Sequence, residues 1–245
     1  MLMQKTERPV SFVPKWVILA LLILLASQIA YHAVSTKLIA EIKPLSSPPH
    51  EQYLALSGLS DRILTAKMLM LKLQSHDNQP GISIPLRDLN YDRVIEWLDL
   101  ILSLDDRTAY PLLAAIRFYA EVEDRDKQRQ MVRYVTAKFL QDPDERWPYM
   151  AHAVYIAKHR IKDMELALQT ARLIRMHAKA DSVPYWARQM EIFVLEDMGE
   201  LEAAKVLIGG LLESGELQDV QQRAFLSQRL EEIEARQDQS PLVTD

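Results

Sequence analysis

The chain of 245 residues contains no cysteine, and glycine and proline are scarce, at 6 and 12 positions. The absence of cysteine excludes disulfide bonds, thiolate nucleophiles and cysteine-ligated zinc or iron–sulfur sites. Sandwiches and barrels of β-strands need many tight turns, and most of these turns are built from glycine and proline. The scarcity of both residues argues against an all-β fold and favours an all-α protein.

Sequence motifs that carry chemistry are also lacking. The chain has no nucleophile elbow, phosphate-binding loop, dinucleotide fingerprint or paired-histidine zinc motif. His152 and His159 share one expected helix, but they lie about 10 Å apart along its axis and no carboxylate stands beside both at ligand spacing. The acidic stretches 105–106 and 121–126 lack the alternating ligands and central glycine of a calcium loop. We therefore expect no enzymatic activity, metal, cofactor or small-molecule substrate.

Charge is distributed unevenly along the chain. Residues 1–46 carry a net charge of +3, whereas the remaining residues hold 24 basic and 32 acidic side chains, a net charge of −8. Binding to nucleic acid independent of sequence depends on lysine and arginine that neutralise phosphates. The acidic body therefore predicts a protein that does not bind nucleic acid.

One long apolar run stands near the N-terminus. The 21 residues from Trp16 to Thr36 carry no formal charge, and a helix of this length spans roughly 30 Å, the thickness of the hydrocarbon core. Trp16 and Tyr31 stand near its ends, where aromatic side chains favour the headgroups. We expect a transmembrane helix over 16–36 after a cytoplasmic segment 1–15. The alternatives are a signal peptide cleaved after Ser35, with Ala33 at position −3, and a buried core helix.

The residues that flank the expected span indicate its orientation in the membrane. Three basic residues precede it and two follow it, which is a weak bias by the positive-inside rule. A single span near the start, followed by a large acidic domain, is typical of bacterial signal-anchors that leave the C-terminal part outside. We expect a single-pass protein of the inner (cytoplasmic) membrane with a periplasmic or extracytoplasmic C-terminal domain.

Helical periodicity fills most of the remaining chain. We expect a Pro/Ser-rich linker over 37–57, a helical repeat domain over 58–237 with one long loop at 75–85, and a disordered tail over 238–245. Similar segments recur around four anchor residues spaced by 37, 36 and 37 positions, namely Val94, Met131, Ala167 and Ala204. The repeating unit is therefore a helical hairpin, and such units must stack to complete a core.

This pattern resembles the tetratricopeptide (TPR) family of helix–turn–helix repeats, whose usual period is 34. The best match runs from Trp186 to Leu207, where Gly199 closes the first helix, Leu201 fills the turn and Ala204 is the small residue at the helix contact. The resemblance implies a right-handed α-solenoid of TPR-like hairpins, with the first helix of each hairpin lining a groove. The exposed residues of that groove would be Tyr149, His152, Ile156, His159, Trp186, Gln189, Phe193 and Glu196.

Two functions agree with this pattern. The first is a membrane-anchored scaffold that binds a protein or peptide partner, on the outer face of the inner membrane, through the groove. The second is an accessory subunit of an envelope assembly for secretion, pilus formation, polysaccharide export or cytochrome maturation, which needs its transmembrane helix to bind. In a third arrangement, the C-terminal helix or the first hairpin fills the groove.

Overall fold

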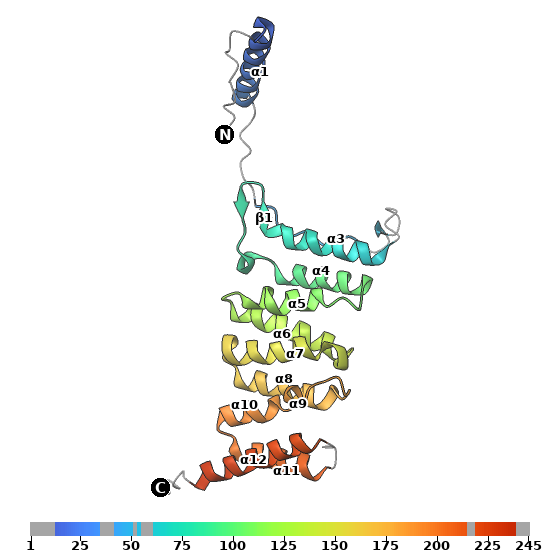
Figure 1. The fold of residues 1–245 in the computed structure, drawn as a ribbon, viewed down its shortest axis with the longest axis vertical. Helices are drawn as coiled ribbons and strands as arrows, with labels where there is room; N and C mark the ends of the chain where they lie inside the picture. The colour runs from blue at the N-terminus through green and yellow to red at the C-terminus, as the bar shows by residue number, and fades with distance from the viewer. Residues whose placement is uncertain (1–12, 35–41, 51–52, 55–60, 215–218, 239–245) are drawn as a thin grey trace, which may run out of the picture. The chain divides into compact units, whose positions relative to one another are not determined.

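A computed structural model describes residues 13–34, 42–50, 53–54, 61–214 and 219–238. The chain divides into two compact units, Met1–Glu41 and Ile42–Asp245. Both are built from helices, apart from a single pair of two-residue strands among the described residues (Figure 1). The expectation of an all-α protein is confirmed.

The first unit contains helix α1, Lys15–Val34. Apolar residues occur on every side of this helix, and none of its residues is buried. Within the described part of the chain, α1 alone is long and apolar enough to cross a membrane. The helix agrees with the expected span over 16–36, of which Ser35 and Thr36 lie outside the described residues.

The second unit begins with a segment, Ile42–His50, that is tied to the helical body. The side-chain amide of Gln79 accepts a hydrogen bond from the Lys43 backbone N–H at 2.9 Å and donates one to the Lys43 carbonyl at 2.8 Å. The Trp97 ring N–H donates to the Ser46 carbonyl at 2.9 Å. Part of the expected linker over 37–57 therefore belongs to the folded body.

The first helical pair is α3, Arg62–Gln74, and α4, Tyr91–Leu104. Each begins at a capping side chain, Asp61 or Asn90, which accepts a hydrogen bond from a first-turn N–H. Between them, in the expected loop, strands β1 (Asn78–Gln79) and β2 (Ile82–Ser83) pair antiparallel. The 3₁₀ turns Ser75–Asp77 and Leu86–Asp88 flank the strands. The sequence analysis did not predict the strand pair or these turns.

The middle of the body follows in chain order. It comprises α5 (Tyr110–Arg117), the 3₁₀ turn Tyr119–Glu121, α6 (Arg125–Phe139), α7 (Pro143–Tyr155), the π-helical segment Ile156–Ile161 and α8 (Met164–His177). Helices that are successive in sequence pack against each other from α5 to α8. The Asp124 and Asp163 side chains cap α6 and α8.

The C-terminal part holds α9 (Tyr185–Arg188), α10 (Met190–Met198), α11 (Leu201–Glu213) and α12 (Val220–Asp238). The sequence predicted one helix where α9 and α10 lie. The structure divides it at Gln189, whose backbone φ and ψ are −91° and −1°. Helix α11 packs against α10 and α12, so the chain ends as a helical pair (Figure 1).

Two helix ends carry a residue in the left-handed region. Lys162 has φ 60° and ends the π-helical segment, and Gly199 has φ 78° and ends α10. Glycine adopts this conformation without strain, whereas lysine does so at a cost of about 1 kcal/mol. The predicted role of Gly199 is confirmed, and Lys162 has the same backbone conformation 37 residues earlier.

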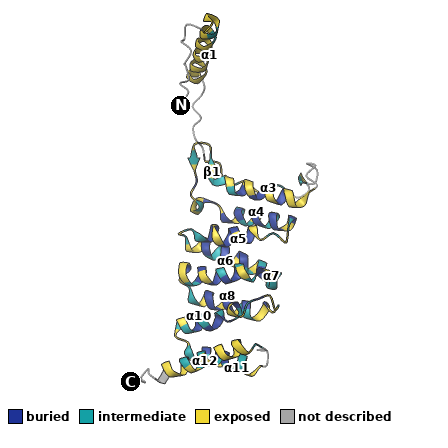
Figure 2. Ribbon diagram, viewed as in Figure 1, coloured by how far each residue is buried: buried dark blue, intermediate teal, exposed yellow. Residues whose placement is uncertain are grey.

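Buried residues run through the whole body on the sides where helices face one another (Figure 2). The predicted small contact residues Ala167 and Ala204 are fully buried. The largest fully buried side chains include Trp97 on α4 and Phe139 on α6. Each helix of the body therefore places an apolar side in a continuous core.

Candidate functional site

The residues predicted for the groove fall into an accessible set and a buried set. Tyr149, His152 and Phe193 are half-buried, and His159 and Trp186 are exposed. Burial raises the pKa of the Tyr149 phenol, which stays neutral at physiological pH. These five residues lie on α7, the π-helical segment, α9 and α10.

The first group of accessible residues is a ring stack formed by His152, Tyr155 and His159. The ring centroids of His152 and Tyr155 are 5.3 Å apart, and those of Tyr155 and His159 are 4.9 Å apart. The three residues follow one another at helical spacing along α7 and the π-helical segment, so their side chains lie on one side. This spacing could have identified Tyr155, which the sequence analysis did not name.

His152 stands between opposite charges supplied by α5 and the turn that follows it. Its Nδ1 lies 3.4 Å from the Arg117 guanidinium, and its Nε2 lies 3.8 Å from a carboxylate oxygen of Glu121. Burial and the nearby Arg117 lower the pKa of His152, which makes the imidazole neutral at pH 7. The Nε2 atom of His152 is buried beside Glu121, so within the ring stack the exposed His159 is the imidazole that can reach a peptide.

The second group is a tryptophan pair made by Trp147 of α7 and Trp186 of α9. Their ring centroids are 5.4 Å apart with an interplanar angle of 77°, the edge-to-face arrangement. Trp186 is 52% exposed. Next to it in sequence, the ring of Tyr185 lies 5.0 Å from the Arg188 guanidinium. The sequence analysis did not identify Trp147, because the contact joins residues 39 positions apart.

The expected exposure is wrong for Ile156, Gln189 and Glu196. Ile156 is fully buried at the start of the π-helical segment, and Gln189 is 5% exposed between α9 and α10. The Glu196 side chain is 6% exposed because Arg229 and Arg236 of α12 approach its carboxylate to 2.7 and 3.5 Å. At Glu196, the C-terminal helix therefore covers the surface that the sequence assigned to a partner.

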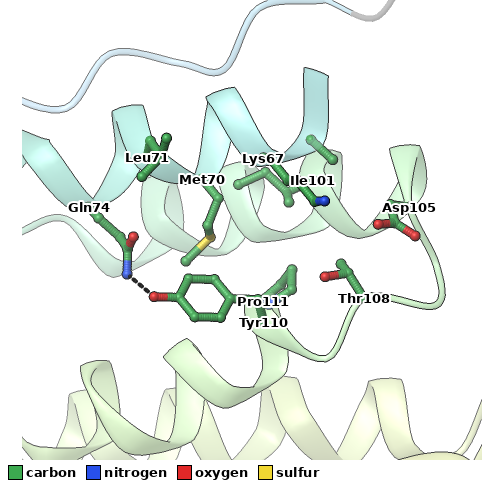
Figure 3. A pocket seen from close by; sticks show the side chains of 10 residues that line it. Lys67, Met70, Leu71, Gln74, Ile101, Asp105, Thr108, Tyr110 and Pro111 are labelled. Carbon is green, nitrogen blue, oxygen red and sulfur yellow. Dashed lines mark hydrogen bonds between the residues drawn. The ribbon is translucent and has the colours of Figure 1, made fainter. Parts of the chain in front are cut away.

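A cavity of about 370 Å³ opens beside α3, α4 and the first turn of α5 (Figure 3). Apolar side chains, including Met70 and Ile101, form most of its lining. The Gln74 amide donates to the Tyr110 hydroxyl at 2.9 Å across one side of it. Lys67 and Asp105 stand at its edge, without a nucleophile and base in contact. The cavity can hold an apolar group but offers no reactive pair.

A second hollow, of about 290 Å³, is polar. His159 of the ring stack borders it together with Arg160 and Lys162, and acidic residues of the turn before α6 stand opposite. Arg160 also binds the Glu121 carboxylate at 3.0 Å. Among the residues that the structure describes, no group of three or more His, Asp and Glu side chains could hold a metal ion.

Comparison with protein-family models, curated proteins and solved structures finds no match to this chain.

Proposed function

We propose that the protein is a membrane-anchored scaffold of TPR-like helical pairs that binds a protein or peptide partner. In this proposal α1 spans the inner membrane, and the body, a right-handed α-solenoid, lies on the periplasmic or extracytoplasmic side. The apolar surface of α1, which has no buried residue, supports the anchor. Residues 1–15 would then be cytoplasmic.

Regular spacing of structural features supports the repeat. The left-handed residues Lys162 and Gly199 are 37 positions apart, which equals the spacing of the anchors Ala167 and Ala204. Polar contacts between neighbouring pairs also recur at similar separations. Arg129 binds Asp163 over 34 residues, Arg160 binds the Glu121 carbonyl over 39, and Lys158 binds Asp197 over 39. Similar separations are what stacked units of one length would give, and they support the proposed repeat.

The ring stack and the tryptophan pair carry the binding proposal. Both begin on α7, and they combine half-exposed aromatic surface with imidazole groups. Aromatic side chains supply much of the contact energy of protein interfaces, and imidazoles can pair with a peptide backbone. The partner surface of this proposal therefore keeps Tyr149, His152, His159, Trp186 and Phe193 of the predicted set and adds Trp147 and Tyr155.

The test is capture of partners from a membrane extract by the full chain. Replacement of His159 and Trp186 by alanine should weaken capture, and it should leave folding intact because both side chains are exposed. The matched control replaces His177 and Phe225, an exposed histidine and an exposed ring elsewhere on the body. Equal capture by both double variants would refute the assignment of this surface.

The alternative function, an accessory subunit of an envelope assembly, differs in what α1 must do. A chain whose residues 15–34 are exchanged for an unrelated apolar helix keeps its anchor and its body. A simple scaffold should capture the same partner after the exchange, whereas an accessory subunit that binds through its span should lose it. Reporter fusions after residue 245 and before residue 16 should report opposite sides of the membrane.

A further inference from the structure

Helix α3 is apolar on two opposite sides. One side packs on α4 through Leu69, Met70 and Leu73, which are buried. The other side carries four exposed apolar residues, here called the outer stripe: Ile63 (52%), Leu64 (50%), Met68 (50%) and Leu71 (66%). At 100° per residue, the outer stripe is centred opposite the buried side.

This exposure is unusual for the place of α3 in the body. Stacked helical units need terminal helices with polar outer faces, because their apolar sides would otherwise meet water. Contiguous exposed apolar residues on a helix generally mark a binding surface. The outer stripe therefore needs an apolar surrounding that the described residues do not supply.

The charge of α3 indicates what kind of apolar surrounding the outer stripe meets. The helix holds Arg62, Lys67 and Lys72 and no acidic residue, although the chain after residue 46 has a net charge of −8. At 100° per residue, Lys67 and Lys72 border Leu64, Met68 and Leu71 on either side, and Ile63 lies beyond Lys67. An apolar stripe bordered by lysine is typical of a helix that lies in the headgroup region of a membrane, and the basic residues favour anionic lipids.

Chain length keeps this helix near a membrane if α1 is inserted in one. Eight residues separate Val34, the last residue of α1, from Lys43, which is hydrogen-bonded to Gln79 of the body. Even a fully extended chain of this length reaches only about 30 Å. Because the body cannot leave the surface, a weak affinity of α3 for lipid suffices for docking.

We propose that the outer stripe of α3 docks into the headgroup region of an anionic bilayer, the same bilayer in which α1 is inserted. This inference rests on the proposed membrane anchor and goes beyond it, since an anchored body could also stand free of the lipid. Docking would hold one end of the body at the membrane and leave the ring stack to the partner.

The absence of cysteine makes the test direct, because one introduced thiol is the only site for a label. The full chain carrying Leu71→Cys is labelled with an environment-sensitive fluorophore and reconstituted in phosphatidylcholine–phosphatidylglycerol vesicles that contain nitroxide lipids. Leu22→Cys in α1 is the positive control, and Val206→Cys, at a position 75% exposed on α11, is the negative control. Quenching at position 71 should exceed that at position 206 by about threefold or more.

The outcomes separate this inference from the anchor on which it rests. Quenching at position 22, with equal weak signals at 71 and 206, would overturn the docking and leave the anchor standing. Absence of quenching at position 22 would overturn both. Disulfide-linked dimers of the unlabelled Leu71→Cys chain, together with no lipid quenching of the labelled chain, would overturn the docking by assigning the stripe to a second copy of the chain.

A charge reversal tests the anionic lipid. Lys67→Glu with Lys72→Glu should lower quenching at position 71 by about threefold, since each basic residue near the surface adds attraction to anionic headgroups. Arg133→Glu with Lys179→Glu makes the same change in net charge at exposed positions elsewhere. Equal quenching in the two double variants, or equal quenching in vesicles of phosphatidylcholine alone, would overturn the assignment to anionic lipid.

Discussion

The first helical pair of the body, α3 and α4, and the last, α11 and α12, are stabilised by different contacts. In the first pair, α4 buries seven residues, among them Trp97, Leu98 and Ile101. In the last pair, α11 buries only Ala204 and Ile208 among its described residues. The first pair is therefore held by a large apolar contact, and the last pair by a small one.

The outer faces of the two pairs differ in polarity. Helix α3 presents the apolar outer stripe, whereas α12 is charged and joined to α10 by ion pairs. Arg229 donates two hydrogen bonds to Glu196, at 2.8 and 2.7 Å, and one to Glu232 at 2.8 Å. Hydrogen bonding to these carboxylates raises the pKa of Arg229. One end of the body is suited to water and the other to an apolar surface.

The stabilising role given to the first helical pair is tested most directly at Trp97. Trp97→Ala should cost about 3–5 kcal/mol of unfolding free energy, because it removes a fully buried ring. It also removes the hydrogen bond to Ser46. Trp186→Ala, at a half-exposed ring, should cost about 1 kcal/mol. Urea unfolding of the full chain in detergent measures both, and similar losses would contradict the importance given to the first pair.

The last pair is tested by overpacking it. Ala204→Leu should cost roughly 1–3 kcal/mol, because the alanine side chain is fully buried and leucine adds three carbons to a packed core. The neighbouring Ala203 is exposed, so Ala203→Leu should leave the melting temperature nearly unchanged. If the two variants melted together, the small-residue position assigned to Ala204 would be wrong.

The ion pairs of α12 give a smaller effect. Glu196→Gln removes the carboxylate that holds Arg229 and Arg236, and it should cost about 1–2 kcal/mol, since the arginine partners remain partly solvated. Amide hydrogen exchange should increase in α12 and stay unchanged in α3 and α4. Glu232→Gln, at a more exposed carboxylate, is the control. An equal increase in exchange in α12 and in α3 and α4 would contradict the view that these ion pairs stabilise only the C-terminal end of the body.

The smallest effect concerns the middle of the body, away from both ends. The pKa of His152 is lowered in the folded protein from its ordinary value of 6.5, so the unfolded chain takes up the proton first. Stability should therefore fall as the pH drops below about 6.5. His152→Gln should reduce this dependence, whereas His159→Gln should preserve it. Chemical unfolding between pH 7.5 and pH 5.5, values on either side of that ordinary pKa, measures the difference.

Much of the helical pattern could be predicted because it depends on local spacing. Apolar residues at three- and four-residue intervals predicted helices on both sides of the loop at 75–85, where α3 ends at Gln74 and α4 begins at Tyr91. Gly199 was predicted to close its helix from the resemblance of the segment Trp186 to Leu207 to the TPR pattern, and α10 ends there. The break at Gln189 was not predicted, because nothing in its immediate sequence interrupts the helical spacing.

The site was predicted less well, since exposure depends on contacts between distant segments. Glu196 lies on the expected face of its helix, but Arg229 of α12, 33 residues later, covers it. Ile156 turns into the core where the helix widens into the π-helical segment. A repeat pattern predicts which side of a helix faces the groove, but only the three-dimensional structure shows which other helix covers that side.

The pairing of Gln79 with Lys43 has a mechanical consequence. A force that pulls on the N-terminal segment reaches the body first at the Lys43 peptide group, and then at Ser46 through Trp97. Helix α3 begins nearly twenty residues beyond Lys43 in the sequence, so traction on the anchor does not unwind it from its first turn. The load passes to the strand pair and to α4, which buries more residues than α3, before any turn of α3 is strained.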